Sequence, residues 1–257
     1  MKFRTILLAS AAVMFAGSAM AADLTNPFYT PSEGKFTSDT AVSHSRDKLK
    51  HHAGVDKATM LSEEVAYGIT DQLAVLGTIV NHFDANNGYN NDHNFEYNLG
   101  VNYNMRDGNV LSQVAAGYTT WNPKDFYGKR NVQGQEGRWQ KVLNAELKLG
   151  YDMGDGLTPY VTYGVEGNVD ASDRELLQTV KAGVHKYTGE WAFGGAVRYE
   201  FETDGHNTNE WWLDANVDYD LTENMALGVY GSYFLDGTGS HETDYNYEAG
   251  AHLKVLF

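Results

Sequence analysis

The chain has 257 residues, a formal net charge of -15 at pH 7, no cysteine and 13% aromatic residues, among which tyrosine is the most frequent. The lack of cysteine excludes disulfides, thiolate nucleophiles, cysteine-based zinc sites and a lipidated-cysteine anchor. The acidic balance argues against nucleic acid as a partner, because contacts to its phosphates require Lys and Arg. Beyond the N-terminus there is no run of about twenty apolar residues, which excludes a helical membrane span.

The N-terminus has the pattern of a secretory signal peptide. Lys2 and Arg4 form a basic start, residues 6–15 form an apolar core, and residues 19–21 have the small-x-small pattern of a cleavage site. We expect residues 1–21 to be removed on export. Loss of the two basic residues would make the mature chain more acidic still.

From residue 36 onward, apolar and polar side chains alternate with a period of two, which indicates β-strands with one apolar face. Residues 22–35 before them are expected to form a short irregular periplasmic lead-in. No change in composition marks a second domain, so we expect one domain over residues 36–257. The predicted strands lie near residues 35–45, 59–68, 72–82, 94–105, 110–120, 139–152, 157–167, 176–187, 190–201, 210–220, 225–235 and 244–257.

The connections between these strands alternate between short and long. Gly, Asn and Asp are common in the short ones, as in tight hairpin turns, and these lie at residues 68–71, 106–109, 152–156, 188–189 and 221–224. The long ones are polar and lie at residues 46–58, 83–93, 121–138, 168–175, 202–209 and 236–243. This asymmetry is typical of outer-membrane barrels, whose short turns are periplasmic. The pattern therefore predicts an all-β, transmembrane, antiparallel up-and-down β-barrel of about twelve strands.

Which face is inside depends on the solvent. Over residues 94–105 an apolar set that starts at Phe95 alternates with a polar set that starts at Asn94. Aromatic residues near the strand ends favour a bilayer, because lipid interfaces select such girdles. A soluble barrel of about twelve strands would also have a core too wide for side chains to fill. The candidate girdles are Tyr67, Tyr103, Tyr151, Trp191 and Tyr219 at one rim and Phe95, Tyr118, Trp139, Phe201, Trp211, Tyr233 and Tyr245 at the other.

Lipid outside places the charged residues in the lumen. For any one of them charge pairing is the commoner role, while together they could line a solute path whose fixed charges set selectivity. Folding residues 190–201 onto 210–220 brings Arg198 close to Asp214. The candidate lumen and selectivity residues are Glu96, Glu146, Lys148, Glu166, Lys181, His185, Arg198, Glu200, Asp214, Asp218, Glu248, His252 and Lys254.

The same inward set contains glycines and aromatic residues. Glycines such as Gly183 and Gly250 would leave space in the lumen or relieve barrel curvature. Inward aromatic side chains would narrow the lumen instead, and these are Tyr160, Trp212, Tyr230 and Phe234. The pattern leaves open whether the lumen is an open pore.

Other chemistry has weaker support. The triplet from Ser43 to Ser45 contains a histidine, but neither an orienting acid nor an oxyanion hole is visible. Acidic and amide residues between Asp84 and Asp92 alternate like calcium ligands but fail the EF-hand pattern. We expect no metal and no cofactor, because the remaining histidines lack a ligand-like spacing; they are His44, His51, His52, His82, His93, His206 and His241.

Two segments carry a family resemblance. The alternating segment that begins at Tyr245 and ends at Phe257 resembles the closing strand of bacterial outer-membrane β-barrels. The turn at residues 67–73 is similar to the periplasmic turns of small porin-like and transporter-like barrels in Gram-negative bacteria. The resemblance covers residues 36–257 and implies an outer-membrane location. It also implies recognition of the closing strand by the barrel-insertion machinery and contact with outer-membrane lipid and lipopolysaccharide.

We therefore expect a passive channel for small hydrophilic solutes and not an enzyme. Net acidity would favour cations or neutral solutes, although inward basic residues could reverse this locally. These residues are Lys148, Lys181, Arg198 and Lys254. Two alternatives stay open. One is an outer-membrane enzyme that acts on lipid at the barrel rim through a set such as His44 and Ser45. The other is a structural or adhesive barrel with no open pore.

Overall fold

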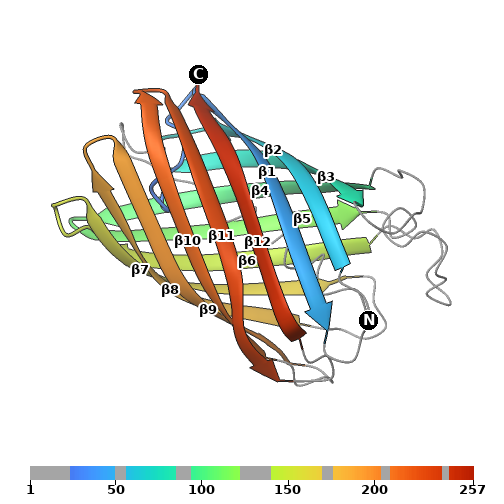
Figure 1. Ribbon diagram of the computed structural model, residues 1–257. Coiled ribbons are helices and arrows are strands. Elements are labelled where there is room, and N and C mark those ends of the chain that lie inside the picture. The colour runs from blue at the N-terminus through green and yellow to red at the C-terminus, as the bar shows by residue number, and fades with distance from the viewer. Residues whose placement is uncertain are drawn as a thin grey trace.

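A computed structural model describes residues 24–49, 56–84, 94–121, 140–169, 176–203, 209–238 and 243–257. These residues form a closed antiparallel barrel (Figure 1), so the expected fold is confirmed. Among them no helix has the length and apolarity that crossing a membrane requires. The strands are β1 (Phe36–Leu49), β2 (Asp56–Gly68), β3 (Leu73–Asp84), β4 (Asn94–Asp107), β5 (Val110–Trp121), β6 (Gln140–Tyr151), β7 (Leu157–Asn168), β8 (Leu176–Thr188), β9 (Trp191–Glu202), β10 (Asn209–Thr222), β11 (Met225–Thr238) and β12 (Thr243–Leu256).

The barrel closes where β1 pairs with β12. In this pairing Asp39 lies opposite Lys254, and the backbone N–H of Phe257 donates to the carbonyl of Phe36 over 2.8 Å. Each strand has a hydrogen-bonded neighbour on both sides, so the sheet has no open edge. The segment that begins at Tyr245 thus forms most of the closing strand, as expected.

The two ends of the barrel differ in their connections. Short turns join β2 to β3, β4 to β5, β6 to β7, β8 to β9 and β10 to β11 at the end where the C-terminus also lies (Figure 1). Gly108 and Gly189 have φ angles of 59° and 65° in two of these turns, a conformation that costs glycine little. We call this the short-turn end and the opposite end the long-connection end. The long connections lie mostly outside the described residues.

Large apolar side chains point away from the barrel axis, and polar ones point into it. Leu99 and Val229 are 68% and 57% exposed on the outside, whereas Thr162 and Asp218 are 2% and 1% exposed within. A water-soluble protein would bury the first pair and expose the second. The expected inversion is confirmed, and the apolar outer surface is the one that lipid covers.

Aromatic side chains mark the two edges of this apolar surface. Trp191 is exposed near the short-turn end, and Trp211 and Tyr233 are exposed near the long-connection end. Trp139 and the side chain of Tyr245, both assigned to the girdles, lie outside the described part of the chain. The two girdles place the lipid interfaces near the ends of the strands.

The outer surface of β1 and β2 departs from the apolar pattern. The Ser38 hydroxyl donates to one oxygen of the lipid-facing Glu63 over 2.6 Å, and the Thr40 hydroxyl donates to the other. Nearer the long-connection end, the His44 ring contacts the Thr59 hydroxyl at 3.1 Å. Polar groups that face lipid here satisfy one another across the two strands.

Candidate functional site

Every candidate lumen residue occupies an inward position of its strand. Nine of these candidate side chains are almost fully buried, including those of Glu96, Lys148 and Arg198. The positions are Glu96 on β4, Glu146 and Lys148 on β6, Glu166 on β7, Lys181 and His185 on β8, Arg198 and Glu200 on β9, Asp214 and Asp218 on β10, and Glu248, His252 and Lys254 on β12. Their roles in selectivity remain predictions.

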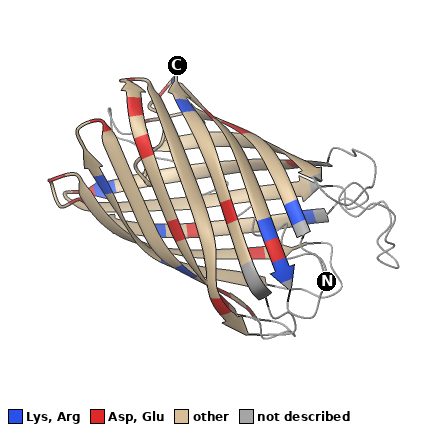
Figure 2. Cartoon of the chain, in the orientation of Figure 1, with Lys and Arg blue, Asp and Glu red and all other residues tan. Residues whose placement is uncertain are grey.

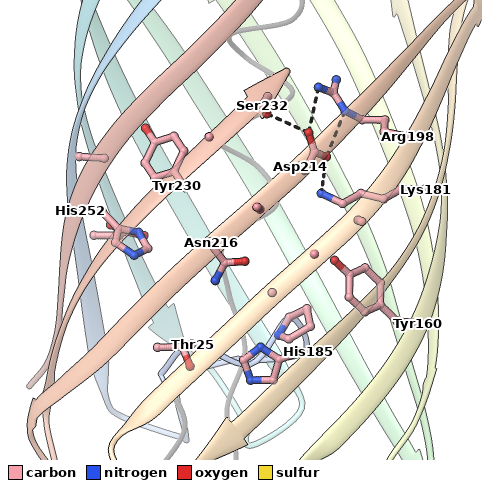
Figure 3. A pocket seen from close by; sticks show the side chains of 18 of the residues that line it. Thr25, Tyr160, Lys181, His185, Arg198, Asp214, Asn216, Tyr230, Ser232 and His252 are labelled. Atoms are coloured by element: carbon pink, nitrogen blue, oxygen red, sulfur yellow. Dashed lines mark hydrogen bonds and ion pairs between the residues drawn. The ribbon is translucent and has the colours of Figure 1, made fainter. Parts of the chain in front are cut away.

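Asp214 is the centre of one charge cluster (Figure 3). Lys181 Nζ lies 2.9 Å from Asp214 Oδ2, and Arg198 Nε lies 3.2 Å from the same oxygen. The Ser232 hydroxyl donates to Asp214 Oδ1 over 2.8 Å, and Arg198 also pairs with Glu200. The expected approach of Arg198 to Asp214 is confirmed. Two cations therefore meet two carboxylates across strands β8, β9 and β10.

A second cluster surrounds His252 on the closing strand. His252 Nε2 lies 2.5 Å from Asp218 Oδ1, and its Nδ1 lies 3.7 Å from Asp39 Oδ2. Lys254 Nζ lies 3.8 Å from the same Asp39 oxygen, and the Asn216 amide donates to Asp218 over 2.5 Å. This network joins β10, β12 and β1, so it spans the closure of the barrel.

The sequence analysis missed lumen carboxylates, among them Asp39 on β1 and Glu64 on β2. The outward set of β1 includes Ser38 and Thr40, so no apolar alternation marks its inner face. Glu64 follows the lipid-facing Glu63, and adjacent strand residues point to opposite faces. In the structure, Thr78 Oγ1 donates to Glu64 Oε2 over 3.3 Å, which shows that the Glu64 side chain points inward. For Glu64 the alternation with exposed Leu61 and Val65 could have indicated the inward face.

The wall formed by β3 to β7 is acidic. His82 Nε2 lies 3.6 Å from Glu96 Oε2, and Lys148 Nζ lies 3.4 Å from Glu146 Oε1. Glu166 is 8% exposed on the same wall. Along the described lumen, carboxylates outnumber Lys and Arg.

The N-terminal segment, residues 24–35, lies inside the short-turn end of the lumen. Lys148 Nζ donates to the carbonyl of Pro27 over 2.8 Å. The Asn104 amide donates to the Phe28 carbonyl and to the Thr30 hydroxyl, each over 2.6 Å. The Phe28 ring lies beneath Lys148 Nζ, which is 5.7 Å from the ring centroid. Side chains of the barrel wall thus bind both the backbone and the ring of the segment.

The segment crosses the lumen from one wall to another. Leu24 and Tyr29 pack with Ala226, and Leu256 packs against this cluster. Further along, the carbonyl oxygen of Ser32 occupies the place that a β-carbon on Gly68 would take. The segment therefore contacts β11, β12, β6, β4 and β2 and occupies part of the mouth at the short-turn end. The sequence pattern indicated irregular structure here but not its insertion into the barrel.

A cavity of about 160 Å³ remains in the lumen beside this segment (Figure 3). Thr25 and Pro27 of the segment line it, together with charged and aromatic side chains of β7 to β12. A smaller cavity of about 50 Å³ lies along the acidic wall beside Glu64, Glu146 and Glu166. The lining of each cavity includes groups that can hydrogen-bond to a polar solute, among them Lys181 and Asp214 in the larger cavity and Glu146 and Glu166 in the smaller one.

The inward glycines do not all leave space, contrary to one expectation from the sequence. A β-carbon on Gly183 would lie 2.7 Å from Cζ of Tyr160, and one on Gly250 would lie 2.6 Å from Cζ of Tyr230. Each tyrosine pairs with its glycine across neighbouring strands. The rings therefore lie across the glycines and take up the volume. At Gly164, by contrast, the nearest atom would be 3.8 Å away.

Among the described residues, the side chains named for a lipid-acting enzyme or a metal site at the barrel rim are not brought together. His44 faces lipid, whereas Ser43 and Ser45 are buried on the lumen side, because neighbouring strand residues point oppositely. Within the described ranges no group of three or more acidic or histidine side chains is arranged to hold a metal ion. The remaining loop histidines lie outside those ranges, except His82, which faces the lumen; those outside are His51, His52, His93, His206 and His241.

No family model and no curated protein matches the sequence. Several solved structures match the fold. An outer membrane channel from Pseudomonas putida F1 has a TM-score of 0.58 at 10% identity, covering 88% of this chain and 96% of that chain. The NanC porin has a TM-score of 0.59 at 11% identity, covering 84% and 98%. The KdgM porin, solved in complex with disordered oligogalacturonate, has a TM-score of 0.53 at 8% identity, covering 85% and 99%.

The closed barrel, its apolar outer surface and its charged lumen define the class: the protein is a bacterial outer-membrane β-barrel. Within that class its fold is the one found in outer membrane channels and porins. At sequence identities this low, the similarity to these structures shows a shared fold only.

Proposed function

We propose that the protein is a passive channel for small hydrophilic solutes and has no catalytic activity. The observation that carries this proposal is the cavity of about 160 Å³ inside a lumen lined by paired charges. A purely structural barrel could fill its interior with apolar side chains, as a sealed core does. The neighbours described as channels and porins support the same proposal.

The size and charge of the lumen indicate which solutes would pass. The N-terminal segment narrows the short-turn end, so solutes of the size of small sugars, amino acids or hydrated ions fit better than oligomers. Lumen carboxylates such as Asp39 and Asp218 favour cations and neutral solutes over anions. The Asp214 cluster places Lys181 and Arg198 on the same path and provides a local site for anionic groups.

Planar-bilayer recording of the purified full-length mature chain tests this function. We expect discrete conductance steps and a reversal potential in a potassium chloride gradient that reports preference for potassium. Liposome swelling with neutral sugars of increasing size should show uptake that falls off sharply beyond small sugars. Bilayers that show no added conductance, together with liposomes that do not swell, would overturn the proposal.

A barrel with no open pore is the second candidate, and one observation favours it. Hydrogen bonds from Lys148 and Asn104 anchor the N-terminal segment within the lumen. If the segment stays docked and seals the mouth, the same recordings will show no conductance in the intact chain. Conductance that appears only after the segment is removed would support this second candidate.

A further inference from the structure

On one side the N-terminal segment lies in direct contact with the barrel wall. Lys148 of β6 donates to the Pro27 carbonyl over 2.8 Å. A β-carbon on Gly150 of the same strand would lie 2.5 Å from Cζ of Phe28, so the Phe28 ring rests on the backbone of β6. The same ring meets the Tyr160 ring of β7 edge-on, with the two centroids 6.5 Å apart. These contacts leave little space between the segment and strands β6 and β7.

On the side of β1 to β3, a cavity separates the segment from the wall. Its volume is about 30 Å³, and Leu24 and Tyr29 are among the segment residues that line it. On the wall it is lined by Thr37 of β1, Ala66 of β2 and Ala74 of β3, among others. Thr37 and Ala66 are paired and stand close to the short-turn ends of their strands. The cavity therefore extends along the segment toward the short-turn end.

Two polar atoms of the residues that line this cavity indicate that it holds water. Tyr29 Oη and Asp39 Oδ1 are buried, and among the described residues neither atom has a hydrogen-bond partner. A buried polar atom without a protein partner is normally hydrated, and the cavity exceeds the roughly 10–15 Å³ that one water molecule needs. A solute that donates hydrogen bonds or carries positive charge can take the place of this water at Tyr29 and Asp39.

Glu64 connects this cavity to the interior of the lumen. It lines the cavity of about 30 Å³ and also the lumen cavities of about 160 Å³ and 50 Å³. Thr78 Oγ1 donates to Glu64 Oε2 over 3.3 Å, and Asp39 lies directly opposite Glu64 in the pairing of β1 with β2. The next inward residue of β2 toward the short-turn end is Ala66. A solute that moves from either interior cavity into the cavity beside the segment therefore passes Glu64.

We propose, resting on the proposed channel function, that solutes cross the short-turn end between the N-terminal segment and strands β1 to β3, with Glu64 at the entrance of this passage. The segment stays bound to β6 and β7 while solutes move past its other side. Tyr29 and Asp39 offer hydrogen-bond partners inside the passage, which suits small neutral or cationic solutes that carry N–H or O–H groups. Charged residues lie at several depths along the strands (Figure 2), so such a solute also meets paired charges before it reaches Glu64.

Cysteine modification tests this passage, because the chain contains no native cysteine. The variants are Glu64→Cys and Ala66→Cys at inward positions of β2, and the matched control is Val65→Cys, which lies between them and is exposed to lipid. His185→Cys stands on β8, across the barrel from β2, and tests an exit on that side of the larger cavity. The reagent is a methanethiosulfonate that carries a trimethylammonium group. Heat-dependent migration in denaturing gels verifies that each full-length mature variant is folded.

In planar bilayers we expect the reagent to remove more than half of the single-channel current of Glu64→Cys and of Ala66→Cys, and a reductant to restore it. The current of Val65→Cys should not change, and that of His185→Cys should fall less. Mass spectrometry of the same variants in detergent should show Ala66→Cys modified about tenfold faster than Val65→Cys, because the charged reagent reaches a thiol in water but not one covered by detergent.

Three results would overturn the passage and leave the channel function intact in a barrel that conducts. One is complete modification of both β2 variants with no loss of current. Another is a larger loss of current at His185→Cys than at Glu64→Cys, which would place the exit beside β8. The third is a thiol at Ala66→Cys that reacts as slowly as the one at Val65→Cys. A wild type that conducts no ions would instead overturn the channel function and, with it, the passage.

Discussion

Lys148 Nζ lies 2.8 Å from the carbonyl oxygen of Pro27, so a lysine near the short-turn end of β6 holds a segment that precedes the first strand. The same ammonium lies 3.0 Å from Gln113 Oε1, and Gln113 Nε2 donates to Asn104 Oδ1 over 2.8 Å. Asn104 completes the chain by donating to Phe28 and Thr30. One continuous hydrogen-bond network therefore joins the wall to the N-terminal segment.

Asn104→Ala should loosen this segment. The substitution removes two bonds to it and leaves the Phe28 carbonyl without its donor, which costs about 1–3 kcal/mol of docking free energy. We expect faster protease cleavage within residues 24–35 and larger, noisier single-channel currents. Asn102→Ala, an inward residue on the same strand, serves as the control. Equal cleavage rates in wild type and Asn104→Ala would show that the segment does not depend on this anchor.

Asp214→Asn should shift ion selectivity toward anions. The change leaves Lys181 and Arg198 without the carboxylate that lies 2.9 Å and 3.2 Å from them. The reversal potential in a salt gradient should move toward chloride, and stability should fall by about 3–5 kcal/mol because the pairs are largely buried. Ser232→Ala removes one bond to the same carboxylate but no charge, so its reversal potential should not change. An unchanged potential in Asp214→Asn would place the ion path elsewhere.

Gly183→Ala should destabilise the barrel more than Gly164→Ala. At Gly183 the added β-carbon would lie 2.7 Å from Tyr160 and 2.8 Å from the carbonyl oxygen of Gly195. Overpacking of this kind costs about 1–3 kcal/mol, whereas the 3.8 Å clearance at Gly164 implies a change within about 0.5 kcal/mol. Urea unfolding in detergent measures both. Equal midpoints would mean that Tyr160 moves aside at no cost.

Leu99→Arg should reveal the lipid environment of β4. Leu99 is 68% exposed near the middle of the strand, where an arginine that faces acyl chains costs about 2–4 kcal/mol. Met105, which also faces lipid, lies near the short-turn end, so Met105→Arg should cost only about 0–1 kcal/mol. Folding titrations into lipid vesicles compare the two variants. Similar costs at both positions would contradict a bilayer centred on Leu99.

Asp155 makes a pH-dependent contribution to the stability of the turn at residues 152–156. The backbone N–H of Leu157 donates to its carboxylate over 3.1 Å and Lys186 lies 3.2 Å away, and these contacts hold the pKa of Asp155 below its ordinary value. The stabilisation is present above the ordinary aspartate pKa and is lost as the pH falls through the lowered pKa. Carbon-detected NMR titration should place the pKa of Asp155 below the ordinary aspartate value. Titration at or above the ordinary value would contradict these contacts.

The local alternation of side chains and the turn residues were enough to predict most of the barrel wall from the sequence. The alternation that starts at Phe95 predicted β4 and its lipid-facing side, and glycine-rich turns such as the one at Gly108 predicted where hairpins reverse. Hairpin register also predicted that Arg198 meets Asp214. These features follow from a two-residue period and from short-range turns, which depend only on residues close in sequence.

Other features depend on the tertiary structure, because the two-residue alternation of apolar and polar side chains does not specify them. The inward direction of Asp39 was hidden because β1 is polar on both faces, and only its pairing with β2 and β12 orients it. The filling of Gly183 by Tyr160 and the entry of Pro27 and Phe28 into the lumen depend on barrel closure. Closure brings residues far apart in sequence to the same depth, and no local periodicity specifies those distances.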